Sequence, residues 1–292
     1  MRKSKYLVLS GLYFDFNDDL SEIKEIKSLF KNQNILDIER FNKLISIKEN
    51  QFEFYNLKFL YLPQNIKSID LCAFRKSKFQ ILDLSNCINL KNIDRCSFEE
   101  NQIKKLKLPK NIEIIGDLAF DRNQIETLNL SNCKNLKIIN EGSFFKNKIK
   151  YLKLPKNIED IRFCAFEDNQ IESIDLSNCI NLNIIKSWAF KSNKIKQLKL
   201  PKNIEEIKYS SFEDNQIESL DLSNYTKLKR IRDNAFSNNP LNEIKILDNI
   251  EIGYDKKNID DLWNKFVKYY NDNKMKSGDY KYNNNEWKWY PL

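Results

Sequence analysis

The sequence predicts an α/β solenoid, a rod of stacked repeats with a parallel β-sheet along one side. Three observations predict it. The chain repeats itself nine times between Lys31 and Asn238, the repeats alternate between 24 and 22 residues, and every repeat carries apolar residues at the same places. A period of about 20 to 29 residues is typical of a solenoid, in which no unit can bury its apolar face alone. We therefore expect one elongated domain.

Two kinds of unit alternate along the chain. The long unit is clearest at Asn123–Lys146, NQIETLNLSNCKNLKIINEGSFFK, and the short unit at Asn147–Asp168, NKIKYLKLPKNIEDIRFCAFED. Both contain the pattern L-x-x-L-x-L-x-x-N/C, the signature of a leucine-rich repeat. The alternating L-x-L predicts a short strand with inward leucines, and stacking would pair these strands into one parallel sheet on the concave side. The convex side has room only for turns, short 3₁₀ segments or brief extended stretches.

Each unit also carries a turn residue and a phenylalanine at fixed places. Asparagine follows the strand in the short units, and we expect it to be buried and to bond backbone groups of the turn. We expect the phenylalanines to form a stacked spine, because a recognition surface would not need such regularity. The turn asparagines are Asn65, Asn111, Asn157, Asn203 and Asn249, and the phenylalanines are Phe52, Phe74, Phe98, Phe120, Phe144, Phe166, Phe190, Phe212 and Phe236.

The short units, with their LKLPKNIExI…AF pattern, resemble the BspA-like (bacterial surface antigen) class of leucine-rich repeats, and the resemblance covers most of the chain. The segment Phe266–Tyr290 also resembles the closing segment of many such proteins in host-associated bacteria. The resemblance implies a leucine-rich-repeat fold and a non-enzymatic adhesion or interaction protein, often exported. The chain departs from the family pattern after the AF element, where Asn123, Asn169 and Asn215 stand in place of the cysteine that the family often has.

The two ends of the array need covers, because each end would otherwise expose apolar core to water. Helical apolar spacing predicts one helix over Asp19–Phe30 and another over Ile259–Tyr270. We therefore expect an N-terminal cap over 1–30, repeats over 31–250 and a C-terminal cap over 251–292. In the terminal EWKWYPL, Trp287 and Trp289 alternate as in a strand, and we expect them to cover the last repeat, with carbohydrate or protein binding as the alternative.

The six cysteines predict free thiols rather than a disulfide framework. Cys87, Cys133 and Cys179 hold the same place in successive long units, two strands apart, which is roughly 10 Å at about 4.8 Å per strand. A disulfide needs Cα atoms within about 7 Å. Buried free cysteines are typical of a reducing compartment, so we favour the cytoplasm.

The N-terminal segment MRKSKYLVLSGLYF has a basic start and a brief apolar run. The run is short and leads into DFNDD without a small-residue cleavage site, so we favour a capping strand over a signal peptide. Export or a cell-surface location is the alternative that the family resemblance implies. No stretch approaches about 18 apolar residues, so no membrane-spanning helix is expected.

The sequence offers little for catalysis. It has no histidine, its five glycines are scattered, and its cysteines lack C-x-x-C pairing. These features argue against a histidine base, a phosphate-binding loop and a zinc site. Carboxylates recur at equivalent surface positions rather than in one irregular cleft. We therefore expect no enzyme activity, no metal and no cofactor.

The outward-facing positions of the predicted strands form the candidate binding surface. Short units carry lysines there and long units carry acids, so neighbouring strands alternate in sign, which helps their pairing. We favour a self-compensating ladder that fixes repeat order over a tuned binding surface at these charges. The less regular early strands supply apolar candidate anchors. The candidate protein-binding residues are Phe59, Tyr61, Phe79, Ile81, Lys105, Lys107, Tyr151, Lys153 and Lys199.

The sequence thus predicts a non-catalytic scaffold that recognises or adheres to another protein through its concave sheet. The net charge of +8 keeps a second class open, a weak non-specific binder of nucleic acid or an anionic surface. Nucleic acid is the less expected partner, because the lysines do not form a continuous basic stripe. A purely structural spacer is the third class.

Overall fold

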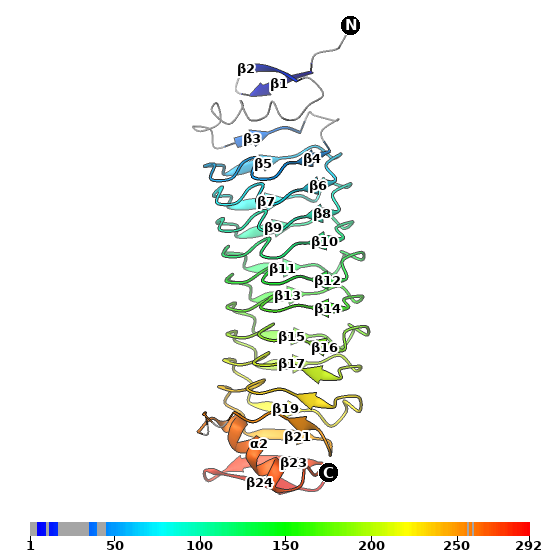
Figure 1. Cartoon of the computed structure of the whole chain (residues 1–292), viewed down its shortest axis with the longest axis vertical. Helices are drawn as coiled ribbons and strands as arrows, with labels where there is room; N and C mark the ends of the chain where they lie inside the picture. The colour runs from blue at the N-terminus through cyan, green and yellow to red at the C-terminus, as the bar shows by residue number, and fades with distance from the viewer. Residues whose placement is uncertain (1–4, 10–11, 17–34, 40–44, 256, 259) are drawn as a thin grey trace.

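The computed structural model describes residues 5–9, 12–16, 35–39, 45–255, 257–258 and 260–292. The repeats stack into a column that runs almost straight in the view of Figure 1. Two rows of short strands run side by side along this column, and each unit contributes one strand to each row (Figure 1). We call one unit of the stack a rung. The leucine-rich-repeat solenoid predicted from the sequence is confirmed.

The first row consists of the predicted L-x-L strands. From β5 to β19 the middle residue of each strand points inward and the two flanking residues face solvent, as the alternation predicts. The strands of the first row are β3 Ile35–Asp37, β5 Phe59–Tyr61, β7 Ile81–Asp83, β9 Lys105–Lys107, β11 Thr127–Asn129, β13 Tyr151–Lys153, β15 Ser173–Asp175, β17 Gln197–Lys199, β19 Ser219–Asp221 and β21 Glu243–Ile246.

The first row is parallel, but it is not the single continuous sheet that we predicted. Each long-unit strand pairs over three residues with the strand of the next short unit, as β11 does with β13 and β15 with β17. The step from a short unit to the next long unit is looser. There β9 and β11 share one residue pair, and the described ladders stop between β13 and β15. Because units of two lengths alternate, the structural repeat is a long unit together with the short unit that follows it.

The second row confirms the brief extended stretches expected opposite the first. Each of its strands has two residues, and the second residue is a buried isoleucine. Neighbouring strands pair in parallel, in one group from β4 to β10 and another from β12 to β22. The strands are β4 Ser46–Ile47, β6 Ser68–Ile69, β8 Asn92–Ile93, β10 Ile114–Ile115, β12 Ile138–Ile139, β14 Asp160–Ile161, β16 Ile184–Ile185, β18 Glu206–Ile207, β20 Arg230–Ile231 and β22 Glu251–Ile252.

The nine repeating phenylalanines form the predicted spine. All nine rings are buried, from Phe52 to Phe236. Neighbouring ring centroids are 5.3 to 5.6 Å apart, and neighbouring planes differ by only 2° to 15°. Parallel rings at this separation attract one another beyond their burial, so the spine also fixes the register of one rung on the next.

A ladder of buried asparagines runs beside the spine. Asn147 shows the arrangement, with its Nδ2 donating to the carbonyl oxygens of Phe120 at 2.9 Å, Phe144 at 3.3 Å and Phe145 at 3.2 Å. Its Oδ1 accepts the backbone N–H of Ile125 at 3.1 Å. One buried side chain therefore satisfies backbone groups of the two preceding rungs. The ladder consists of Asn101, Asn123, Asn147, Asn169, Asn193, Asn215 and Asn239.

The ladder corrects our prediction about the turn asparagines. Asn111 and Asn203 do bond backbone, donating to the carbonyl oxygens of Ile88 at 3.0 Å and Ile180 at 2.8 Å, and Asn157 bonds to that of Lys134. None of these side chains is buried, however, and Asn249 is exposed. They lie at the rim of the turn, where water reaches the amide. The buried asparagines are instead those that start the units from Asn101 onward, three of which we had noted only as a departure from the family pattern.

All six cysteines are free and buried, as predicted. The thiol of Cys133 lies 3.8 Å from the carbonyl oxygen of Pro109 on the preceding rung, and burial raises its pKa to about 11. Cys72 and Cys96 lie on neighbouring rungs, since the N–H of Cys72 bonds to the carbonyl oxygen of Arg95, so our two-strand spacing argument does not cover them. Burial and Glu99 raise the pKa of Cys96 to about 12, which keeps that thiol protonated.

The C-terminal segment packs against the last rung. The helix α2, Leu262–Asp272, begins at Asp261, whose carboxylate accepts the N–H of Asn264 at 3.1 Å. Trp263 of this helix meets Phe236, the last ring of the spine, at 5.1 Å. The predicted apolar stripe is confirmed at Trp263, Phe266, Val267 and Tyr270, which are buried, whereas Ile259 lies outside the described residues.

A hairpin completes the C-terminal segment. Its strands are β23 Gly278–Asn283 and β24 Glu286–Tyr290, and β23 pairs antiparallel with β21, the last strand of the first row. This pairing covers the edge that β21 would otherwise expose. Trp287 is buried and Trp289 is half-buried, so both side chains pack against the column rather than pointing into solvent.

At the N-terminal side, β1 Lys5–Leu9 and β2 Leu12–Phe16 form an antiparallel pair where we expected a single capping strand. The helix predicted over Asp19–Phe30 lies outside the described residues.

We predict that Asn147→Ala lowers the free energy of unfolding by about 2–4 kcal/mol, because it leaves several buried backbone groups unpaired. Asn157→Ala is the matched control, since this half-exposed amide donates one hydrogen bond, to the carbonyl oxygen of Lys134, and the substitution should cost about 1 kcal/mol or less. Urea unfolding followed by circular dichroism measures both. Equal effects of the two substitutions would contradict the role assigned to the ladder.

We predict that a chain truncated after Asp255 frays or aggregates, because the truncation uncovers the edge of β21 and the last ring of the spine. Light scattering and thermal unfolding measure this. A truncated protein that stays monomeric with unchanged thermal stability would show that α2 and the hairpin do not act as a cap.

Candidate protein-binding surface

Three exposed apolar side chains lie next to one another on the first row. Ile35 of β3 pairs in register with Phe59 of β5, and Ile81 holds the same place on β7, the next strand. These side chains are 47%, 43% and 50% exposed, and we call them the apolar row. Tyr61, two residues after Phe59, faces the same side and is 48% exposed. The parallel strands hold all four on a backbone with little freedom to move.

The structure corrects one candidate of this group and adds another. Phe79 is fully buried, so our expectation that it is an exposed anchor was wrong. It occupies the first apolar place of L-x-x-L-x-L, which Ile103 fills on the next rung, and its ring packs edge-on against Phe74 at 5.6 Å. We missed Ile35 because the first long unit is degenerate. Aligning its ILD with the ILD of Ile81–Asp83 would have identified it.

Beyond the apolar row, charges of opposite sign face each other across neighbouring strands. Lys107 Nζ lies 2.8 Å from a carboxylate oxygen of Asp83, and Lys199 Nζ lies 3.3 Å from one of Asp175. Burial opposes ionisation of Asp83, but bonds from Lys107 and Ser85 hold its pKa below the usual value. The Ser177 hydroxyl, aided by Lys199, lowers the pKa of Asp175. The expected alternation is therefore present at these rungs, although such exposed pairs add little stability.

The other candidates lie along the same face. Lys105 pairs in register with Ile81 of the apolar row, so a cation borders the apolar surface. Tyr151 pairs with Thr127 and is 66% exposed. Lys153 pairs with Asn129 rather than with an acid, and it makes no ion pair within the described part of the chain. The structure thus brings Phe59, Tyr61 and Ile81 together and leaves the later candidates spread along the column.

A second surface, which the sequence analysis missed, lies on the second row. Phe163, Trp188 and Tyr209 come from three successive rungs just before the spine phenylalanines, and all are exposed. The rings of Phe163 and Trp188 are 4.8 Å apart, and Lys191 Nζ lies 5.9 Å from the Trp188 ring. Comparing equivalent positions across units would have found these aromatics, because the other units with a spine phenylalanine carry no aromatic residue at those places.

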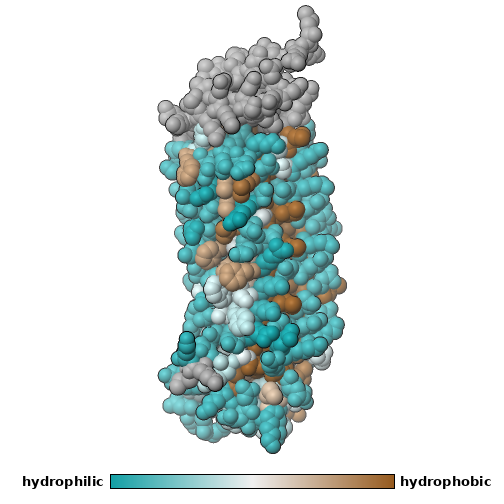
Figure 2. Space-filling model, in the orientation of Figure 1, coloured by the Kyte–Doolittle hydropathy of each residue, from teal (hydrophilic) through white to brown (hydrophobic). Residues whose placement is uncertain are grey.

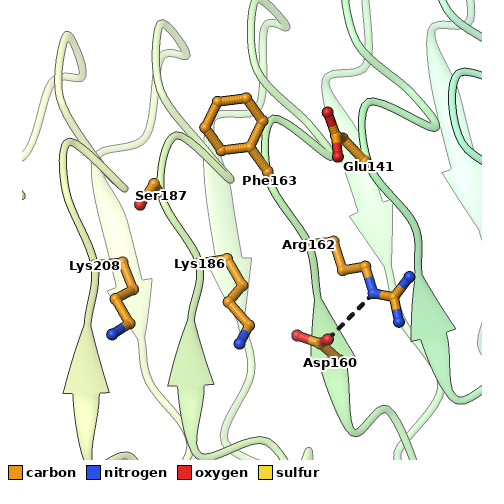
Figure 3. Close-up of a pocket in the computed structure, with 7 residues that line it drawn as sticks. All are labelled: Glu141, Asp160, Arg162, Phe163, Lys186, Ser187 and Lys208. Carbon is orange, nitrogen blue, oxygen red and sulfur yellow. Dashed lines mark hydrogen bonds and ion pairs between the residues drawn. The ribbon is translucent and has the colours of Figure 1, made fainter.

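A shallow hollow of about 330 Å³ lies beside these aromatics. Arg162, Lys186 and Lys208 line it from three neighbouring rungs, next to Phe163 (Figure 3). Asp160 and Glu141 line it as well, and Asp160 is bonded to Arg162 at 3.4 Å. The hollow is open to solvent rather than enclosed, so it can hold a ligand only against one face.

Figure 2 shows a mostly hydrophilic face on which apolar groups lie in small separate spots. In the described ranges no cluster of three histidine, cysteine or acidic side chains could hold a metal ion. Within those same ranges no helix combines the length and apolar character needed to cross a membrane.

Two solved structures of leucine-rich proteins resemble the chain at a distance. YopM, a leucine-rich effector protein from Yersinia pestis, is 23% identical with a TM-score of 0.44, over 82% of this chain and 62% of YopM. A leucine-rich cell surface protein from Faecalibacterium prausnitzii is 14% identical with a TM-score of 0.32, over 79% of this chain and 63% of that protein. The chain thus matches less than two thirds of either protein. No functionally curated protein matches it.

The family, by contrast, is well defined. The sequence matches the BspA type leucine rich repeat region in six copies, over residues 22–144 and 137–256. This match spans most of the chain and coincides with the two rows of strands, the spine and the asparagine ladder. The chain therefore belongs to the family of proteins with BspA-type leucine-rich repeats.

Proposed function

We propose that the chain is a non-catalytic scaffold that binds another protein on its first row, with the contact centred on the apolar row and Tyr61. One observation carries this proposal. Three apolar side chains stand exposed on adjacent rungs, where the later rungs carry polar or charged residues and a single tyrosine, Tyr151. Single exposed apolar residues are common, but a contiguous set on a regular scaffold needs a reason beyond stability.

The geometry favours binding of a preformed surface. Phe59 and Tyr61 lie on β5, which pairs in parallel with β3, and Ile81 lies on β7, which pairs in parallel with β9. The middle residues of β5 and β7 are buried. A partner would therefore meet side chains whose backbone is already ordered, and association would cost little conformational entropy on this side. Aromatic residues in such settings supply most of the binding energy of an interface.

The charges beside the apolar row would set orientation rather than affinity. Lys105 and Lys107 lie on the strand after Ile81, and Lys107 is already paired with Asp83. Rim charges of this kind mainly steer association and exclude mismatched partners. Leucine-rich-repeat scaffolds are commonly used to bind proteins and generally carry no catalytic site, which agrees with this role.

We predict that the double substitution Phe59→Thr with Tyr61→Asn weakens binding of the partner by at least about 2 kcal/mol, or about thirtyfold. The new residues are those that β11 carries at the same places, Thr127 and Asn129, so the strand should still form. The partner is first identified by a photo-crosslinker placed at Phe59, and its affinity is then measured by calorimetry.

The control for this experiment is the double charge reversal Lys153→Glu with Lys199→Glu on later rungs. It should leave the affinity nearly unchanged, because these lysines lie far along the column from the apolar row. If the charge reversals abolish binding while the aromatic substitutions have no effect, the contact lies on the lysines and the proposal for the apolar row is wrong.

We also predict that the chain binds DNA or RNA no more tightly than roughly 10⁻⁶ M at about 0.15 M salt, and without sequence preference. The lysines of the first row alternate with acids, as at Asp83–Lys107 and Asp175–Lys199, so a phosphate backbone finds no continuous track. Fluorescence anisotropy with labelled oligonucleotides across a salt series measures this. Nanomolar binding at that salt concentration would favour the nucleic-acid alternative over a protein partner.

A further inference from the structure

The second row carries a feature that the proposed protein contact does not use. Arg162, Lys186 and Lys208 lie at the same place on three successive rungs, one residue before the row that carries Phe163 and Tyr209. Trp188 projects from the rung between these two aromatics and packs against Phe163. We call these six residues the aromatic–cationic stripe.

The stripe departs from the pattern of the preceding rungs. Its three cations lie on neighbouring rungs, whereas the four preceding rungs carry Asp70, Asp94, Gly116 and Asn140 at the same place. Phe163 and Tyr209 are 38% and 48% exposed at a place where other rungs carry polar residues such as Glu141 and Asp233, and Trp188 is 39% exposed. The exposed aromatic rings and the cations occur on the same rungs. Their coincidence points to a ligand.

Counter-charges in the chain engage two of the three cations and leave the middle one free. Arg162 is bonded to Asp160 at 3.4 Å and to the side-chain oxygen of Asn140 at 2.8 Å. Lys208 is 2.8 Å from Glu206, a buried carboxylate whose pKa stays below the usual value despite burial because Lys208 and Arg232 bond to it. Lys186, between them, makes no ion pair in the described ranges and lines the hollow of Figure 3.

The spacing of the stripe limits what can bind along it. Backbone bonds from Cys164 to Ser187 and from Trp188 to Tyr209 keep the rungs in register, so equivalent atoms recur at about 4.8 Å. Same-face side chains of an extended peptide recur at roughly 6.6–6.8 Å, which does not match. A sugar ring in a linear chain is about as long as one rung. A sugar ring also has an apolar face that packs on aromatic rings, and a ring carboxylate accepts charge-assisted bonds from lysine.

We propose that the aromatic–cationic stripe binds a short carboxylated oligosaccharide. The sugar rings pack against Phe163 and Trp188, and a ring carboxylate accepts bonds from Lys186 in the hollow. Arg162 and Lys208 remain bonded to Asp160 and Glu206, so Lys186 is the cation of the stripe that meets the carboxylate. This site lies on the second row and is independent of the proposed protein contact on the first row.

The test uses calorimetry with the full chain and a tetrasaccharide of galacturonic acid. Lys186→Asn and Trp188→Asn introduce residues that the chain already carries at these places, Asn140 and Asn234, and Trp188 and Asn234 share positive φ angles of 61° and 58°. Each substitution should weaken binding at least about tenfold. The methyl-esterified tetrasaccharide, which lacks the charge, should bind weakly to the unsubstituted protein.

Two controls remove the same residue types from the first row. Tyr151→Thr and Lys153→Asn copy the residues of β11 and should leave sugar binding unchanged, as should the Phe59→Thr/Tyr61→Asn variant. The proposal is overturned if the unsubstituted protein gives no binding heat, if the charged and esterified sugars bind equally, or if the stripe substitutions have no effect. It is also overturned if a hexaglutamate peptide or an oligouridylate binds the stripe more tightly than the sugar does. If only the first-row variant loses sugar binding, the sugar binds on the first row and the proposal is overturned as well.

Discussion

The buried asparagine that starts each unit from Asn101 onward is the interaction on which the rest of the structure depends. In a narrow coil, backbone N–H and C=O groups are buried at the corners as well as in the strands, and each must find a partner. The amide of Asn147 donates to Phe120 and Phe144 and accepts from Ile125, so it joins three successive rungs at one point. The stacked phenylalanines beside it allow little change of register. Together they hold the spacing of both rows of strands.

This regular interior leaves the exposed positions free to vary from rung to rung. Most of these positions carry residues that are compatible with their neighbours on the stack, as the ion pairs of Asp83 with Lys107 and of Asp175 with Lys199 show. Two groups of exposed residues depart from this pattern, the apolar row on the first row and the aromatic–cationic stripe on the second. Both place apolar groups in water on consecutive rungs, and the stripe adds like charges side by side. The proposed functions follow from these two departures from the repeat.

The period of the repeats was enough to predict the fold, because inward leucines and the phenylalanine spine recur at every unit. The period did not distinguish which asparagine is buried, since the short units from Asn101 onward carry an asparagine both at the place of Asn147 and at that of Asn157, and only packing separates them. We wrongly predicted that Phe79 is an exposed binding residue, because it is an aromatic residue at a buried position that isoleucine fills in later units. Phe163, Trp188 and Tyr209 were missed because units of different length hide the equivalence of positions on neighbouring rungs. Contacts between rungs, rather than the pattern within one unit, decide these cases.

Hydrogen exchange at the backbone amides that bond to the ladder tests this account most directly. These are the N–H groups of Ile103, Ile125, Ile149, Ile171, Ile195 and Ile217, each bonded to an asparagine Oδ1 at 2.9 to 3.1 Å. If the ladder holds the rungs together, these amides exchange only when neighbouring rungs separate, and they are among the slowest in the protein. Exchange as fast as that of the exposed turn amides, such as Lys134, would show that the asparagine bonds open independently and that the stack does not depend on them.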